Sequence, residues 1–484
     1  MPLRDRLIAA GVVLALLAVL GTAAAWRVLD DDTSPTESAT APAPAPEATG
    51  PSSTADPEEW PIELEPLVEF VERERGGPFT NPVRVEYLEE DEYRDAVVGE
   101  TTDTTPEDAA DLEIWEGQLR ALGLVDPGVD LQDALDQLYG EGTLAYYDDE
   151  EDVVRVLGTR LDIAHQVTLV HELVHAWQDQ HGFLDDYREL DDTPAYVLQT
   201  LAEGDASRIE TAFVDTLSSG ELEDYYDQSA DQARGIDLDG VPEALLASFA
   251  GPYLLGEQFV SVLDHIGGND EVDTAFEQLP ASEADLMDPT RYLDGILPVE
   301  VAEPAVPAGA ELLDAGPFGA TSWLITLAER IDPRDALDLV DRWAGDSAVI
   351  YRVDGRTCTA VAYQGQAPTD LDLAMARIGE WADASAGLAA TAERVGDTAV
   401  LRSCEPTDGG AEVAGRSQTS VQYPATRLEA AVQALDEGAS LEEALCFGDA
   451  LVDQVTYQQM DDGVLYLPGQ SRDLVDRAAE ACLN

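Results

Sequence analysis

The sequence predicts a mostly helical α+β fold, with a small antiparallel sheet beside a central helix and a disulfide-bearing α/β region towards the C-terminus. Three observations predict it. Apolar residues recur at helical spacing over several long stretches, short β-rich runs precede the first of them, and all four cysteines lie in the last third of the chain. Hydrophobic residues make up 45% of the 484 residues, which is enough for a packed core in two or three domains.

The chain is strongly acidic. It carries 99 Asp and Glu against 26 basic residues, a formal net charge of −73, and every basic residue is arginine. Such a charge repels phosphate, which excludes nucleic acids as partners and disfavours anionic membrane surfaces. An acid excess without lysine favours a protein kept soluble in strong salt; GC-rich coding that exchanges Lys for Arg is the alternative. The oligomeric state stays open.

The N-terminal segment predicts export. Arg4 and Arg6 precede a run without charge, residues 7–26, so residues 1–29 form either a cleaved signal peptide or a single-pass transmembrane anchor. Both alternatives place the rest of the chain outside the cell, secreted or anchored to the membrane. Residues 30–59 are rich in Pro, Ala, Ser and Thr, which is typical of a disordered linker.

The next elements follow from periodicity and turn residues. Residues 144–147 and 153–157 read as two strands around an acidic turn. Residues 163–181 form a long amphipathic helix that Gly182 ends. Another helix runs from Asp192 to about residue 217, with Thr193 as N-cap and Pro194 at its first position.

The remainder of the chain divides into two parts. We expect a domain over residues 60–346 and a C-terminal α/β region over residues 347–484. Further predicted helices cover 243–266, 319–331, 335–344, 370–384 and the tail from 427, and further predicted strands cover 348–353, 357–363 and 398–403.

Four cysteines in an exported chain indicate two disulfides. Three pairings are possible, and loop length favours pairing of nearest neighbours, Cys358 with Cys404 and Cys446 with Cys482. The spacing contains no short Cys-x-x-Cys clip, so a zinc ribbon is a poor interpretation.

The candidate chemistry is concentrated in His171-Glu172-Leu173-Val174-His175. Residues four apart on a helix lie on one face, about 6 Å apart along the axis, so both imidazoles can reach one metal ion. Glu172 would flank a metal-bound water and accept its proton, which makes it the candidate catalytic base. Zn²⁺ is the expected cofactor, because it accepts imidazole and carboxylate ligands. The alternative is that two surface histidines have this spacing by chance, which is improbable in a chain with only 5 histidines.

Two residues compete to be the third ligand. His181 stands ten residues after His171, the spacing that metzincin metalloproteases use, but that resemblance implies a helix-breaking glycine where this chain has Gln178. On an unbroken helix His181 lies about 9 Å beyond His175 and points elsewhere. We therefore favour Glu203, on the following helix. His181 then supports a metal ligand, faces the substrate or caps the end of its own helix, and capping is favoured.

The segments 171–181 and 203–206 resemble a family of uncharacterised exported bacterial proteins of the gluzincin type of zinc metallopeptidase. The resemblance covers roughly residues 60 to 405 and implies a zincin-like metallopeptidase domain. This chain departs from the family at two positions, with Asp288 where a histidine is expected and Ser207 where a carboxylate is expected, leaving Asp205 as a substitute. Its downstream landmarks are Gly267-Gly268, Leu279-Pro280, Asp288-Pro289-Thr290-Arg291-Tyr292 and Trp343-Ala344-Gly345-Asp346.

The sequence thus predicts an exported zinc endopeptidase that acts on peptides or proteins. In the zincin arrangement an edge strand beside the metal helix pairs with the substrate, and residues 144–147 or 153–157 could be that strand or simply a hairpin that covers the helix. His265 and Tyr253 are candidate transition-state donors, although a structural role is favoured for each. One alternative is a zinc-binding but non-catalytic extracellular module. The other is a surface protein in which the motif is incidental; a repeat array would support that interpretation, and the sequence contains none.

Overall fold

The computed structural model describes residues 59–102, 106–140, 144–159, 161–185, 187, 190–234, 236–238, 240–407, 415–466 and 471–483. The fold in these ranges is α+β and mostly helical, as predicted. The predicted N-terminal segment 1–29 and all but the last residue of the linker 30–59 lie outside the described residues. Within the described ranges, no helix combines the length and apolar character needed to cross a membrane.

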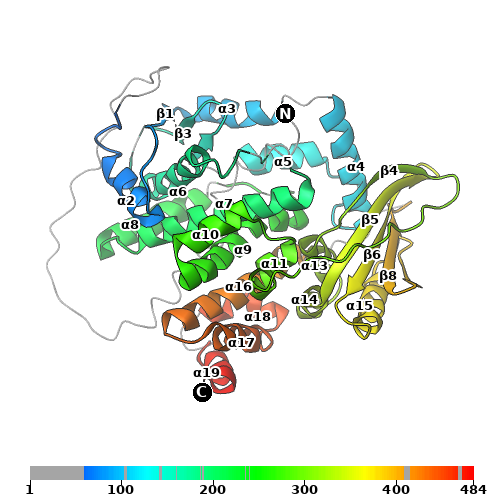
Figure 1. Cartoon of the computed structure of the whole chain (residues 1–484). Coiled ribbons are helices and arrows are strands. Elements are labelled where there is room, and N and C mark those ends of the chain that lie inside the picture. The colour runs from blue at the N-terminus through cyan, green and yellow to red at the C-terminus, as the bar shows by residue number, and fades with distance from the viewer. Residues whose placement is uncertain are drawn as a thin grey trace.

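Four helices pack one against the next through the middle of the molecule (Figure 1). They are α6 (Ile163–Gln180), α7 (Asp192–Val214), α9 (Glu243–Gly267) and α16 (Ser417–Asp436). Both α7 and α9 are largely buried because each is covered on two sides. They approach closely where Gly204 meets Gly256: a Cβ atom added to Gly204 would lie 2.2 Å from the backbone carbonyl carbon of Gly256.

A small sheet lies beside α6. Its strands β2 (Ala145–Asp148) and β3 (Val153–Leu157) are antiparallel, as predicted. A third strand, β1 (Arg84–Leu88), pairs with β3 in parallel, so the sheet is mixed and has the order β1-β3-β2. The prediction of a purely antiparallel sheet is therefore wrong. Arg84-Val85-Glu86-Tyr87 alternates polar and apolar residues, so β1 carried a strand signal that the prediction overlooked.

The second sheet is antiparallel and has the order β4-β5-β6-β8-β7. Three of its strands were predicted, each shorter than observed; the bounds are β4 (Glu311–Gly316), β5 (Trp343–Val353), β6 (Arg356–Gly365), β7 (Thr391–Val395) and β8 (Thr398–Cys404). The helix predicted over 335–344 is α14 (Pro333–Asp341), so its C-terminal end was placed wrongly. Trp343 instead begins β5 and donates its indole N–H to Asp346.

Both predicted disulfides are confirmed. Cys358 and Cys404 face each other across β6 and β8. Cys446 of α17 (Leu441–Val452) is bonded to Cys482 of α19 (Arg472–Cys482). Two disulfides suggest an oxidising, extracellular setting.

The largest hydrophobic core joins both predicted parts of the chain. It contains Tyr93 and Trp323 from the first part and Trp381 and Phe447 from the second. The predicted boundary at 346/347 falls inside β5, and β4 from the first part lies at the edge of the second sheet. The other elements are α2 (Glu65–Arg75), α3 (Glu90–Thr102), α4 (Pro106–Leu122), α5 (Leu131–Gly140), α8 (Ser219–Ala233), α10 (Asn269–Glu277), α11 (Glu283–Met287), α12 (Pro289–Leu293), α13 (Ala320–Ala328), α15 (Asp370–Ala384), α18 (Tyr457–Asp461) and a 3-10 turn, Val464–Tyr466.

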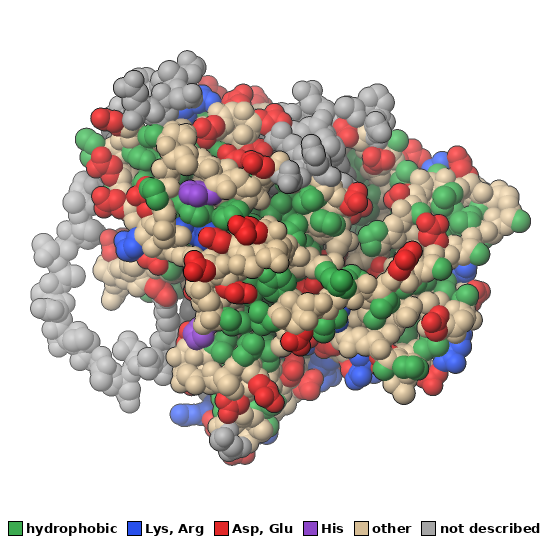
Figure 2. Space-filling view, in the orientation of Figure 1, with side chains coloured by type: hydrophobic (Ala, Val, Ile, Leu, Met, Phe, Trp, Pro, Cys, Tyr) green, Lys and Arg blue, Asp and Glu red, His purple; other side chains and the backbone are tan. Residues whose placement is uncertain are grey.

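Carboxylates are the main charged groups on the visible face of the molecule. Figure 2 shows Asp and Glu side chains scattered over the visible face rather than gathered in one patch, with few arginines between them. On this face the charge does not mark one docking surface, and the interior offers a more specific arrangement.

Candidate metal centre

Helix α6 places His171, Glu172 and His175 inside the molecule. Asp162 caps its N-terminus by accepting from the backbone N–H of His165, and Gly182 follows its end at φ 77°, as the sequence predicted for this glycine. The helix is continuous across the motif, so the two histidines lie one turn apart, with ring centroids 4.8 Å apart.

Helix α7 brings Glu203 to them. It begins at Asp192, and its N-cap is Asp191 rather than the predicted Thr193. Pro194 therefore lies inside the first turn, where its missing N–H costs nothing because these groups have no partner within the helix. The close crossing at Gly204 and Gly256 fixes α7 at the residue next to Glu203.

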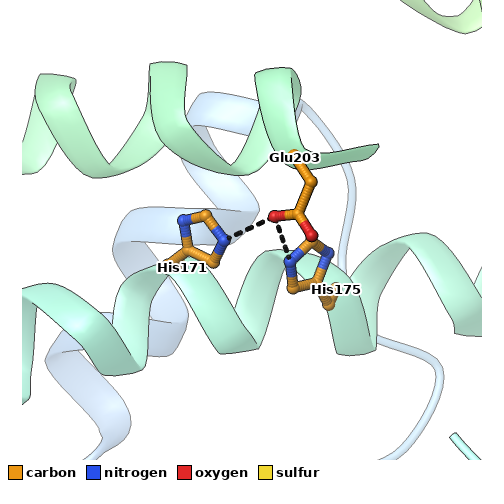
Figure 3. Close-up of side chains that lie close together, drawn as sticks. All are labelled: His171, His175 and Glu203. Atoms are coloured by element: carbon orange, nitrogen blue, oxygen red, sulfur yellow. Dashed lines mark hydrogen bonds and ion pairs between the residues drawn. The ribbon is translucent and has the colours of Figure 1, made fainter. Parts of the chain in front are cut away.

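The Glu203 carboxylate points between the two imidazoles (Figure 3). Its Oε2 lies 3.2 Å from Nε2 of His171 and 3.3 Å from Nε2 of His175. The exposed fractions of His171, His175 and Glu203 are only 1%, 3% and 1%. Across the part of the chain that the structure describes, this is the one group of three such side chains with ligand atoms within 4.8 Å of one another.

The other ring nitrogens show that this group suits a cation. Nδ1 of His171 lies 3.0 Å from a carboxylate oxygen of Glu210, and Nδ1 of His175 lies 3.0 Å from the amide oxygen of Gln178. Both Nδ1 atoms must therefore carry the proton, so in a neutral imidazole the Nε2 lone pair faces the Glu203 oxygen. Lone pairs that face one another repel unless a metal ion or an extra proton lies between them. Oε1 of Glu203 is also buried without a hydrogen-bond partner. The group can therefore hold a metal ion.

The pKa shifts of the group also favour a positive charge at its centre. Burial alone would raise the pKa of Glu203, but the opposing effect of His175 and His171 is larger and lowers this pKa from 4.5 to about 2. Burial lowers the pKa of His171, yet its hydrogen bonds to Glu203 and Glu210 hold that pKa well above its usual range. Without a metal ion, the centre thus attracts positive charge as protons.

Glu172 is held beside the imidazoles by the small sheet. The backbone N–H of Tyr147, in β2, donates to Oε2 of Glu172 over 2.8 Å. Burial raises the pKa of Glu172 to about 7, although His171 and His175 act against this. A carboxylate with such a pKa can take up a proton near neutral pH.

Three other residues singled out in the sequence lie elsewhere or contact the group differently. His181 is the C-cap of α6; its Nδ1 lies 2.7 Å from the Trp177 carbonyl oxygen and its ring stacks on Trp177 at 3.6 Å. It is not a member of the metal group. His265 lies near the end of α9, with Nδ1 3.5 Å from Asp436. The ring of Tyr253 is buried and stacks at 6.2 Å from that of His171.

The residues behind the histidines were missed. Glu210 was not singled out, although it follows Glu203 by two helical turns and so shares its face. Gln178 was considered only because it occupies the position where the metzincin pattern has a helix-breaking glycine. Asp205 accepts from Gln178 over 3.0 Å and lies 3.1 Å from Nε of Arg75, so it supports His175 indirectly.

Comparison with protein-family models, curated proteins and solved structures gave no match.

Proposed function

We propose that the chain is an exported zinc metallopeptidase with a gluzincin-type centre in a zincin-like domain. One observation carries the proposal: His171, His175 and Glu203 converge on one point, with Glu172 held next to them. Two nitrogens and one carboxylate oxygen are the donor set of a catalytic zinc site, which leaves a coordination position for water or substrate.

Each residue of the centre has its own role in the proposed reaction. His171, His175 and Glu203 would hold Zn²⁺, which when bound supplies a Lewis acid that acidifies water and polarises a carbonyl group. Glu172 accepts the proton of the attacking water. The N–H of Tyr147 holds one of its carboxylate oxygens, so the other is the oxygen we assign to that proton. The protonated Glu172 can then return the proton to the leaving amine.

The edge of the small sheet supports peptide as the substrate. β2 pairs with β3 on one side: Tyr146 is opposite Arg155, and Leu157 N–H donates to the Leu144 carbonyl. In an antiparallel strand, alternate residues direct their main-chain groups to opposite sides. Ala145 and Tyr147 therefore direct theirs away from β3, and the bond from Tyr147 to Glu172 shows that this side faces the metal centre. An extended peptide added there would bring its backbone to Glu172.

The test separates metal binding from cleavage. Glu172→Gln should keep zinc but lose cleavage of a fluorescence-quenched random peptide library by orders of magnitude, because the ligands stay while the base is lost. Glu203→Gln should lose both, since a neutral amide oxygen is a poorer ligand than a carboxylate. The control is Glu223→Gln on α8, which makes the same chemical change on the surface. Wild-type protein that binds zinc but cleaves nothing, or an active Glu172→Gln variant, would contradict the peptidase proposal.

Burial supports a second candidate, a zinc-binding extracellular module without catalytic activity. The four residues of the centre are at most 3% exposed, as in a closed structural site. Against it, a structural zinc ion takes four protein ligands, whereas three converge here among the described residues, and such a site needs no carboxylate like Glu172. Stoichiometric zinc in a wild-type protein that cleaves no peptide would favour this second candidate.

A further inference from the structure

The two imidazoles of the centre are held from behind by partners of different charge. The partner of His171 is Glu210, whose Oε2 lies 3.0 Å from Nδ1 and whose side chain is 15% exposed. Glu203 and Glu210 are two turns apart on α7, so a single helix face supplies both the acceptor beside Nε2 and the acceptor behind Nδ1. His171 is therefore fixed in position and in tautomer from both sides.

His175 has a neutral partner whose orientation is also fixed. The amide nitrogen of Gln178 donates to the Ala202 carbonyl over 3.1 Å and to Asp205 over 3.0 Å. With its NH₂ group committed to two acceptors, Gln178 must present its oxygen to His175, and Nδ1 of His175 must donate. The charge of Asp205 is balanced in turn by Arg75 and by Arg208, which lies 3.0 Å away.

The contacts of α7 show which of its candidate side chains lies behind an imidazole of the centre. Ser207, at the position where the family resemblance implies a carboxylate, has a buried hydroxyl without a hydrogen-bond partner. Asp205, the substitute considered from the sequence, reaches Gln178 rather than an imidazole. Of these three side chains on α7, only Glu210 contacts a ring nitrogen of His171.

We propose that Glu210 is a positioning residue that sets the metal affinity of the centre by acting through His171, while Gln178 fixes His175 without adding charge. The inference rests on metal binding in the proposed function and does not require peptide cleavage. A negative charge behind Nδ1 raises the basicity of Nε2, and partners of this kind are typically worth 10- to 100-fold in metal affinity.

Two variants of Glu210 separate its charge from its hydrogen bond. Glu210→Gln keeps an oxygen for the Nδ1–H but removes the charge, and Glu210→Ala removes both. The control is Glu257→Gln on α9: this half-buried carboxylate accepts from Thr211 Oγ1 over 2.8 Å and lies near the same face of α7. All variants are made in the full chain, and thermal unfolding of the metal-free proteins reports whether each still folds.

The readouts are the zinc dissociation constant, from competition with a chromophoric chelator, and the visible absorption spectrum of the Co²⁺-loaded protein. We expect the dissociation constant to rise about 10- to 100-fold in Glu210→Gln and at least as much in Glu210→Ala, with an altered Co²⁺ spectrum, and to change less than threefold in Glu257→Gln. Folded Glu210 variants with wild-type affinity and spectrum would overturn the assignment. Wild-type protein that binds zinc with these effects but cleaves no peptide would overturn only the peptidase proposal.

Discussion

Replacing Gly204 by alanine tests how strictly the helix crossing positions the metal centre. The added Cβ would lie 2.2 Å from the carbonyl carbon and 2.3 Å from the carbonyl oxygen of Gly256, whereas ordinary contact begins at 3.4 Å. The obstacle is backbone and cannot rotate away, so α7 and α9 must part by about 1.2 Å, the difference between 3.4 and 2.2 Å. Overpacking of this kind costs about 1–3 kcal/mol, which exceeds the gain of roughly 0.5–1 kcal/mol from alanine in a helix.

The displacement would occur next to Glu203, whose Oε2 lies only 3.2 and 3.3 Å from the two ring nitrogens. We therefore expect Gly204→Ala to unfold at lower urea concentration and to bind zinc at least tenfold more weakly. The matched control is Gly379→Ala in α15, where a Cβ meets nothing within 4 Å, so this variant should be stabilised by about 0.5–1 kcal/mol. A Gly204→Ala protein as stable as wild type, with unchanged zinc affinity, would refute the argument that this crossing positions Glu203.

Two further predictions concern His181 and Glu283. His181→Gln should retain zinc at the wild-type level, because His181 contacts the Trp177 carbonyl and ring rather than the metal group; loss of zinc in this variant would restore it as a ligand. Glu283 is buried, accepts from the backbone N–H of Thr321, and has its pKa raised from 4.5 to about 7 by that burial. The folded state thus holds a proton that the unfolded state releases, and the free energy of unfolding should fall by roughly 3 kcal/mol between pH 4.5 and 7 through this group. Urea denaturation at pH 5 and pH 8 should show a smaller decrease for Glu283→Gln than for wild type, and equal decreases would contradict the assignment.

The approach of His171 and His175 to one another could be predicted from the sequence because it depends on local periodicity. The spacing of His171 and His175 places both on one face of any unbroken helix, and helix continuity through Gln178 argues against His181. The contact of Glu210 with His171 could not be predicted, because helix α7 carries several carboxylates. Which of them faces α6 depends on how α7 is rotated about its axis, and that rotation is set by packing against Gly256 in a different part of the chain.

The errors in the fold have a similar origin in contacts between distant residues. β1 finds its parallel partner in Val153–Leu157, far along the chain, and no local turn indicates that pairing. Trp343 and Ala344 are apolar and could extend α14, but pairing with β6 draws Trp343 into a strand. Asp346 reinforces this choice, because it accepts from the indole N–H groups of Trp343 and Trp323.

The sequence positions of the centre have a consequence for the order in which the protein assembles. His171 and Glu203 are 32 residues apart, Tyr147 and Glu172 are 25 apart, and His171 and Glu210 are 39 apart. The whole candidate centre therefore belongs to one short stretch of the chain, from Tyr147 to Glu210. The length-dependent cost of closing a loop of 32 residues is roughly 3 kcal/mol, whereas structural zinc sites in small peptides supply about 10–16 kcal/mol. We expect a bound metal ion to join α6 and α7 into a hairpin, whose final geometry is set when Gly256 of α9 packs against Gly204.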